Sequence, residues 1–318
     1  MKNIYSNIFK VNNSIMARAI KYLKKNQAIG VPTETVYGIA GNAYSNSSIQ
    51  KIYNLKNRPK INPLIVHFYN FKHIQNDVEI DKRFLKLYKK FCPGPITFVL
   101  KKKLNSKISK LATANLSTVA IRFPKHRIIR QILKKLKFPL AIPSGNKSQS
   151  VSPVTASDVA EEFKHKLKFI IDGGRSNIGI ESTVVDLTGK IKILRPGLIS
   201  REQINGVLKI NMSNFKNPRV IKSPGSLKKH YSPGIPMVLN KKRKGEKHAF
   251  IIFGKKYKNN KNVFNLSKNA NLKEAAKNLY RILRKIKKLK YKKIYVVKIK
   301  NKGVGMAIND RLKHAANK

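Results

Sequence analysis

The sequence of 318 residues predicts an α/β protein with a twisted, mixed parallel and antiparallel sheet and a second, smaller α/β domain near its C-terminus. Two observations point to this class. Short apolar runs that end in Gly, Pro or Thr recur along the chain, as is typical of buried strands. Stretches with apolar residues at helical spacing separate some of these runs but not others. Because the two kinds of element intermix without strict alternation, we expect a mixed sheet rather than a purely parallel one.

Up to residue 210 the chain shows six helical patterns besides its apolar runs. We expect helices over 14–26, 47–58, 84–91, 126–136, 155–163 and 201–208, and strands within 28–32, 63–68, 96–102, 118–124, 139–143, 169–174, 181–187 and 192–197. Ser14 is a possible N-cap of the first helix, and Ser47 or Ser48 starts the second. Thr155 with Asp158 predicts a capping box, and Ser200 with Gln203 caps the last of these helices.

Residues 211–235 are rich in Pro and Gly and hold no period, which indicates a linker. Beyond it we expect strands over 248–254 and 293–299, an amphipathic helix over 272–286 and a helical C-terminal end, with an exposed loop at 255–262. The predicted organisation is a large domain over 1–210, a linker over 211–235 that could act as a lid, and a small C-terminal domain over 236–318.

The composition excludes several classes of protein. A single cysteine, Cys92, excludes a disulfide framework and a Cys-rich zinc site. No stretch approaches 18 apolar residues and the N-terminus lacks an apolar signal region, so we expect a cytoplasmic protein with no membrane association. The formal net charge of +55 fits either drift toward the A/T-rich codons of Lys, Asn and Ile or a role in binding polyanions, and the sequence leaves both readings open.

Cationic and hydroxyl side chains gather where predicted strands end. The cations are Lys56, Arg58, Arg122 and Arg195, and the hydroxyls are those of Thr35, Thr118, Ser144 and Ser182. Guanidinium groups match phosphate oxygens, and neutral donors suit a sugar and a base, so the set indicates a phosphate-rich ligand. The chain has neither a P-loop nor the dinucleotide fingerprint GxGxxG, and it also lacks HExxH and GxSxG.

The motifs PTETVYGIAGNA, KNRPKINPLIVH, CPGPITFVLK, TVAIRFP, IPSGNKS, IIDGG, ESTVVDL and ILRPG together resemble the Sua5/YrdC/YciO family. They cover about residues 15–200 in the order of that family. The segments SPGSLKKHYSP and GVGMAINDRLKHAA resemble the linker and the C-terminal end of its long, Sua5-type members. The resemblance implies a YrdC-like fold and the synthesis of L-threonylcarbamoyladenylate and pyrophosphate from L-threonine, bicarbonate and ATP. A threonylcarbamoyl-transferase complex then modifies position 37 of tRNAs that decode ANN codons, so contact with tRNA is indirect or weak.

The resemblance also implies roles for individual residues. Those similar to the threonine-site residues are Thr35, His67, Arg122 and Ser182. Those similar to the nucleotide-site residues are Arg58, Asn62, Thr118, Ser144, Asn146, Ser152 and Arg195, with Tyr231 of the linker expected to cover the nucleotide. Lys56, Arg58 and His67 are the expected catalytic groups, whereas Glu34 and Glu181 either act at the site or orient loop amides. We expect Mg²⁺ to accompany ATP, with no protein-held metal and no organic cofactor.

Two other functions compete with this one. An RNA-binding module would use a basic groove without adenylyl transfer, and steep salt dependence without ATP binding would favour it. A carbamoyltransferase of the hydrogenase-maturation type contains a related domain, but it also needs zinc-finger cysteines, which one cysteine cannot supply. Departures from the family pattern include Cys92 before PGP and PSGN in place of the commoner PSAN.

Overall fold

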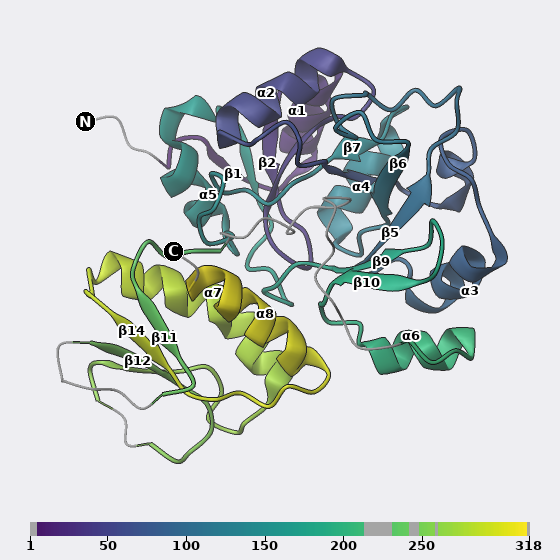
Figure 1. Cartoon of the computed structure of the whole chain (residues 1–318). Coiled ribbons are helices and arrows are strands. Elements are labelled where there is room, and N and C mark those ends of the chain that lie inside the picture. The colour runs from purple at the N-terminus through teal and green to yellow at the C-terminus, as the bar shows by residue number, and fades with distance from the viewer. Residues whose placement is uncertain (1–4, 213–230, 242–247, 258–259, 317–318) are drawn as a thin grey trace.

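The structure is a computed structural model that describes residues 5–212, 231–241, 248–257 and 260–316 (Figure 1). Within these ranges the chain forms a large unit around a ten-stranded sheet and a small unit around a four-stranded sheet. The strands of the large unit are β1 (Ile8–Lys10), β2 (Ile29–Val31), β3 (Gly38–Asn42), β4 (Ile65–His67), β5 (Ile96–Lys101), β6 (Thr118–Arg122), β7 (Leu140–Ala141), β8 (Ile170–Asp172), β9 (Thr183–Asp186) and β10 (Lys192–Arg195). Its helices are α1 (Asn13–Lys24), α2 (Asn46–Lys56), α3 (Lys82–Phe91), α4 (Arg127–Lys135), α5 (Ala156–Phe163) and α6 (Arg201–Leu208), with 3₁₀ turns at Phe71–Ile74 and Lys164–Lys166.

The small unit contains strands β11 (Met237–Leu239), β12 (Ala249–Ile252), β13 (Val263–Asn265) and β14 (Ile294–Val296). Its helices are α7 (Leu272–Lys288) and α8 (Val304–Ala316). All three of its strand pairings are parallel, in the order β11-β14-β12-β13.

The mixed sheet predicted from the sequence is confirmed in the large unit. Its strand order is β1-β8-β2-β3-β7-β4-β6-β5-β9-β10. The β1–β8, β2–β8, β4–β6 and β5–β9 pairs are parallel, whereas β2–β3, β3–β7, β4–β7, β5–β6 and β9–β10 are antiparallel. This mixture agrees with the irregular alternation of helices and strands along the chain.

Alternation along the strands gives the large sheet a core on each face. Ile39 and Ile170 belong to a cluster that contains buried residues of α2, α3, α5 and α6. Their neighbours Ala40 and Ile171 belong to a second cluster with buried residues of α1 and α4. Helices therefore cover both faces, and the functional side chains are confined to strand ends and loops.

Most predicted elements are present, and the errors fall on short strands and helix starts. The strand β3 follows β2 directly and was predicted as loop, because its sequence GIAGN holds two glycines. β1, β11 and β13, of three residues each, were also missed. The caps of α1 and α2 are Asn12 and Ser45, not the serines predicted. Both predicted capping boxes are confirmed, at the starts of α5 and α6.

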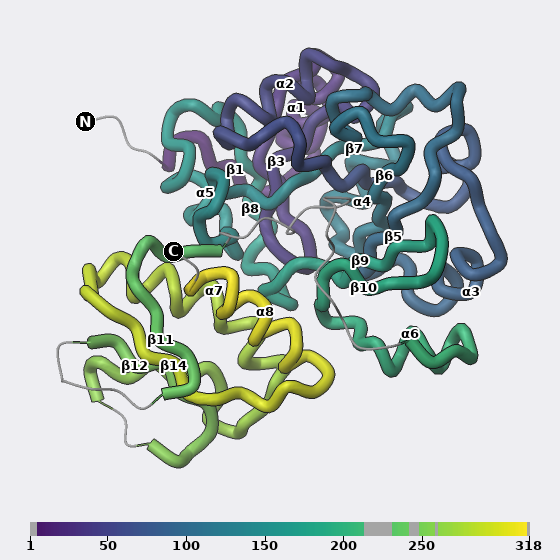
Figure 2. Tube along the Cα trace, in the orientation of Figure 1, coloured from purple at the N-terminus to yellow at the C-terminus, as the bar shows by residue number. Residues whose placement is uncertain are grey.

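The small unit packs against the large one through α7 and α8, which lie between the small sheet and the large unit (Figures 1 and 2). Val151 and Ile180 of the large unit share one hydrophobic cluster with apolar residues of both helices. At Gly179, where φ is +80°, a Cβ would lie 2.6 Å from the Cα of Lys277 in α7. The two backbones approach too closely there for any residue but glycine.

No helix within the described ranges has both the length and the apolar character needed to cross a membrane. Of the predicted linker, residues 213–230 lie outside the described part of the chain, and with them Pro218, Pro224 and His230.

Candidate active site

One cavity collects side chains from strands of the large sheet, from the loops that join its elements and from the residue that precedes the small unit. Its lining residues are Thr35, Val36, Arg58, Ile65, His67, Arg122, Ile142, Pro143, Ser144, Glu181, Arg195 and Tyr231. Three of these are arginines that are at least nine-tenths buried. Burial makes a guanidinium costly unless it finds an anion or a fixed partner, so the arrangement is typical of an anion-binding site.

Sheet register places one group of these residues side by side. His67 of β4 and Thr97 of β5 both pair with Arg122 of β6. Directly opposed residues of neighbouring strands point to the same face, so the three side chains form a row. Thr97 was not among the predicted site residues, because the row is visible only once the strands are paired.

Glu34 holds Arg122 from the loop between β2 and β3. Arg122 Nη2 lies 2.7 Å from Glu34 Oε1, and Nη1 donates to Thr35 Oγ1 at 2.9 Å. Burial opposes the charge of Glu34, but the Arg122 guanidinium holds the pKa of this carboxyl below its usual value. The other carboxylate oxygen accepts from the backbone N–H of His126 at 3.3 Å. Glu34 therefore both orients a loop amide and fixes the arginine, while Arg122 Nε has no partner among the described residues.

His67 lies in the wall as a neutral imidazole. Burial and the nearby Arg122 charge keep its pKa well below the ordinary value. Its Nδ1 is 3.1 Å from the carbonyl oxygen of Ile65, which fixes the ring. The group can therefore offer a hydrogen bond without adding charge to the site.

Arg58 and Arg195 form the more cationic end of the cavity. Arg58 donates to the carbonyl oxygens of Asn62 and Pro63 at 3.0 and 2.9 Å, and burial lowers its pKa to about 10, which leaves it positive at neutral pH. Arg195 donates to Ser182 through Nε and Nη2, each at 3.1 Å. Ser182 Oγ lies 2.7 Å from Thr97 Oγ1, so this serine joins the row of Arg122 to Arg195.

Lys56 supports a loop and does not line the cavity. Its Nζ donates to the carbonyl oxygen of Ser144 at 2.5 Å and to that of Asn146. Burial, with Arg58 nearby, places its pKa well below the usual value. The expectation that Lys56 neutralises phosphate charge directly does not fit this position, because its terminal nitrogen already donates to the carbonyl oxygens of Ser144 and Asn146.

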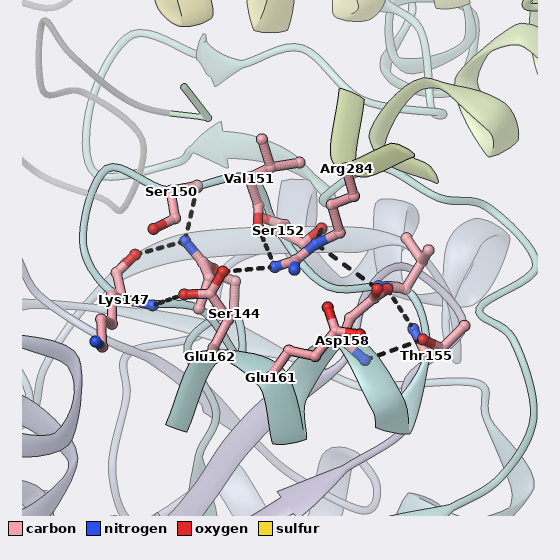
Figure 3. Close-up of polar contacts among 12 residues, drawn as sticks. Ser144, Lys147, Ser150, Val151, Ser152, Thr155, Asp158, Glu161, Glu162 and Arg284 are labelled. Carbon is pink, nitrogen blue, oxygen red and sulfur yellow. Dashed lines mark hydrogen bonds and ion pairs between the residues drawn. The ribbon is translucent and has the colours of Figure 1, made fainter. Parts of the chain in front are cut away.

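The same loop is fixed from the small unit by Arg284 of α7 (Figure 3). Arg284 Nη2 donates to the carbonyl oxygen of Val151 at 2.6 Å and to Glu162 Oε1 at 3.0 Å. Asn146 Nδ2 donates to the carbonyl oxygens of Lys147 and Ser150, both at 2.8 Å. The loop that presents Ser144 is thus held in shape by both units.

Glu181 and Tyr231 form the remaining wall, where the small unit reaches the cavity. Glu181 Oε1 accepts from Ser152 Oγ at 2.6 Å. Its Oε2 accepts from Tyr280 of α7 at 2.8 Å and from Arg311 Nε of α8 at 2.9 Å. Glu181 therefore joins the two units, a role that its ESTVV motif did not reveal.

The structure brings seven of the predicted site residues to the cavity wall. They are Thr35, Arg58, His67, Arg122, Ser144, Arg195 and Tyr231. Lys56, Asn62, Thr118, Asn146, Ser152 and Ser182 do not line it. Thr118 begins β6, at the opposite end of the strand from Arg122. Asn62 is buried, and neither its Oδ1 nor its Nδ2 has a partner within the described ranges.

Two family models match the chain. One, described as telomere recombination (Sua5/YciO/YrdC), matches residues 21–197, and one described as the C-terminal domain of threonylcarbamoyl-AMP synthase matches residues 199–317. The threonylcarbamoyl-AMP synthase of Pyrococcus abyssi is 33% identical over 94% of this chain and 93% of its own length. That of Bacillus subtilis is 32% identical over 96% of this chain and 94% of its own.

Solved structures agree with these matches. The crystal structure of P. abyssi Sua5 complexed with L-threonine superposes with a TM-score of 0.89 at 31% identity, covering 97% of each chain. Escherichia coli YciO, at 19% identity and a TM-score of 0.54 over 61% of this chain, shares the fold. The chain therefore belongs to the Sua5/YrdC/YciO family, in its long form with a Sua5-type C-terminal domain, and is an enzyme of the threonylcarbamoyl-AMP synthase kind.

Proposed function

We propose that this chain makes L-threonylcarbamoyladenylate from L-threonine, bicarbonate and ATP, with release of pyrophosphate. The observation that carries the proposal is the convergence of Arg58, Arg122 and Arg195 on one buried cavity. The relative solved with L-threonine, similar over 97% of both chains, supports the choice of amino acid.

The two ends of the cavity suit the two substrates. At one end, Arg122 is aimed by Glu34 and Thr35, and we assign it to the threonine carboxylate, with neutral His67 as a hydrogen-bond partner of the amino acid or its carbamate. At the other end, Arg58 and Arg195 would bind the triphosphate, with Ser144 beside it. Tyr231 would cover the nucleotide.

The chemistry asks mainly for charge neutralisation and alignment. The threonine amine adds to the carbon of bicarbonate with loss of water, and a carbamate oxygen then attacks the α-phosphorus. The bond from that phosphorus to the bridging oxygen breaks, and pyrophosphate leaves with the electron pair. Because two anions must meet, fixed guanidinium groups lower the barrier without any covalent intermediate on the protein.

We propose that Mg²⁺ enters with ATP and is held by phosphate oxygens and water. Of the described residues that line the cavity, Glu181 alone carries a carboxylate, and both of its oxygens already accept hydrogen bonds from Ser152, Tyr280 and Arg311. Such a lining suits a metal that reaches the site on the triphosphate.

Downstream, we propose that a threonylcarbamoyl-transferase complex passes the product to adenosine 37 of ANN-decoding tRNAs. We also propose that residues 1–210 form the catalytic domain and 236–318 the second domain. The match of a separate family model to residues 199–317 supports two domains.

Pyrophosphate release with purified chain tests the reaction. Release should require ATP, L-threonine and bicarbonate together, and mass spectrometry should detect threonylcarbamoyladenylate. Serine, valine and isoleucine serve as matched amino-acid controls. Release that persists when threonine is omitted would contradict the proposal, and salt-sensitive tRNA binding without any ATP binding would favour the RNA-binding module instead.

A further inference from the structure

The wall of the cavity that carries Glu181 and Tyr231 is built against the small unit. Arg311 of α8 has no exposed surface, although it carries a charge. Its Nε donates to Glu181 Oε2 at 2.9 Å, and its Nη1 lies 2.6 Å from Asp310 Oδ2. A buried guanidinium shared between two carboxylates is a fixed part of the structure rather than a mobile surface charge.

The same guanidinium lies against the second wall residue. The Arg311 guanidinium carbon is 5.1 Å from the ring centroid of Tyr231, within the range of a cation–π contact. The Tyr231 ring also stacks on Tyr280 of α7, with centroids 5.8 Å apart. One residue of α8 therefore touches both cavity residues on this side.

Glu181 places a buried negative charge in the cavity wall, and Arg311 compensates this charge. Burial alone would raise the pKa of Glu181, but the charges of Arg311 and Arg195, with the hydrogen bond from Ser152, lower it to about 2. The carboxylate is therefore ionised at neutral pH, in the wall of a cavity proposed to bind a triphosphate. An uncompensated negative charge there would repel the ligand, and it would also draw the Arg195 charge away from phosphate.

We propose that Arg311 is a positioning residue for the nucleotide: it neutralises Glu181 and fixes Tyr231, so that the small unit completes the ATP side of the cavity. The Arg195 charge then acts on the phosphates, because Arg311 of α8 supplies the positive charge that neutralises Glu181. The inference rests on the proposed function, because it assumes that this cavity takes ATP.

The contacts of Arg311 predict an effect on ATP binding that a general loss of packing would not produce. Its partners are on the Glu181 side of the cavity, whereas the predicted threonine residues Thr35 and Arg122 are held by Glu34 within the large unit. Loss of Arg311 should therefore weaken ATP binding much more than threonine binding. Removal of the Glu181 charge as well should recover much of that loss.

The experiment measures the dissociation constant of ATP and that of L-threonine by calorimetry, using the full-length chain. The variants are Arg311→Met, the double variant Arg311→Met/Glu181→Gln, and Lys288→Met. The last is the matched control, because Lys288 also bridges the two units, through Glu161 at 2.6 Å, but its side chain is 59% exposed and lies away from the cavity lining.

We expect Arg311→Met to weaken ATP binding about tenfold or more, since a charge-assisted contact is lost, with threonine binding changed less than about threefold. The double variant should bind ATP at least about fivefold more tightly than Arg311→Met, because it removes the buried Glu181 charge and leaves only Asp310, whose side chain is partly exposed, without the guanidinium. Lys288→Met should match the wild type for both ligands. If Arg311→Met does not fold, the double variant, which removes both charges, is compared with the wild type and should bind ATP within about fivefold of it.

Three results would overturn the inference. In the first, Arg311→Met binds ATP as the wild type does. In the second, it loses ATP and threonine equally, as general damage would cause. In the third, Glu181→Gln gives no recovery in the double variant. If the wild-type chain itself binds no ATP, the proposed function and this inference both fail, whereas the other three results leave the proposed function intact.

Discussion

Replacing Arg122 with methionine tests the threonine end of the cavity, because methionine keeps much of the volume and removes the charge. Arg122 is 4% exposed, and its two terminal nitrogens bind Glu34 and Thr35. A charge-assisted hydrogen bond to the threonine carboxylate contributes about 1.5–3 kcal/mol. The KM for threonine should therefore rise roughly ten- to hundredfold, while the KM for ATP stays within about threefold.

The same change should cost stability, since Glu34 is left buried without its partner. Breaking a buried ion pair from one side costs about 3–5 kcal/mol. The double variant Arg122→Met/Glu34→Gln removes the stranded charge and should regain much of that stability. It should not regain threonine affinity, because the guanidinium proposed to bind the carboxylate is still absent.

Two assays separate these effects. Pyrophosphate release at varied threonine and varied ATP gives the two KM values, and urea denaturation gives the free energy of unfolding. Equal rises in both KM values, or recovery of threonine use in the double variant, would show that Arg122 acts through the fold and not on the amino acid.

Three further predictions concern other parts of the chain. Arg195→Met should raise the KM for ATP about tenfold and leave that for threonine within about threefold, and the reverse pattern would invalidate the division of the cavity. His67 has a folded-state pKa well below its unfolded value of about 6.5, so the unfolded chain binds the extra proton and stability falls as pH drops below about 6.5, by up to about 1.4 kcal/mol per pH unit for this group. His67→Gln should reduce that slope in urea denaturation between pH 7 and pH 5, and an unchanged slope would contradict the assignment. Lys255→Gln/Lys256→Gln, which removes two exposed charges of residues that do not line the cavity, should leave turnover within about twofold of wild type, and a large loss would favour a functional role for the net charge.

The sequence is informative about the fold where elements are long and capped. Helices such as α5 begin at a Thr155–Asp158 capping box, and their local chemistry alone fixes their start. The three residues of β1 show no alternation that marks them as a strand, and only their pairing with β8 identifies them as one. Strand β3 was missed for a related reason, because its glycines hide its pattern.

The sequence pointed to some of the residues that line the cavity but not to their geometry. Arg58, Arg122 and Arg195 stand in recognisable motifs, and all three line the cavity. Whether a cation faces a ligand or supports a loop depends on its tertiary contacts, so the sequence did not show that Lys56 donates to the carbonyl oxygens of Ser144 and Asn146.

The contribution of the small unit was the least predictable part. Arg311 lies 130 residues along the chain from Glu181, and its segment GVGMAINDRLKHAA, although it resembles the family, did not show that this arginine reaches the cavity wall. Only the packing of α8 shows that its charge is buried.

The hydrophobic cluster shared by the two units predicts that they unfold together as one cooperative unit. Val36, Val151, Val154 and Ile180 of the large unit pack among apolar residues of α7 and α8. A chain cut after Asn211 would expose these four side chains to water and leave Glu181 without two of its donors. A lower activity of the shortened chain could then come from partial unfolding of the large unit as well as from the loss of Tyr231. Substitutions within the intact chain are for this reason the sharper way to ask what the C-terminal domain does.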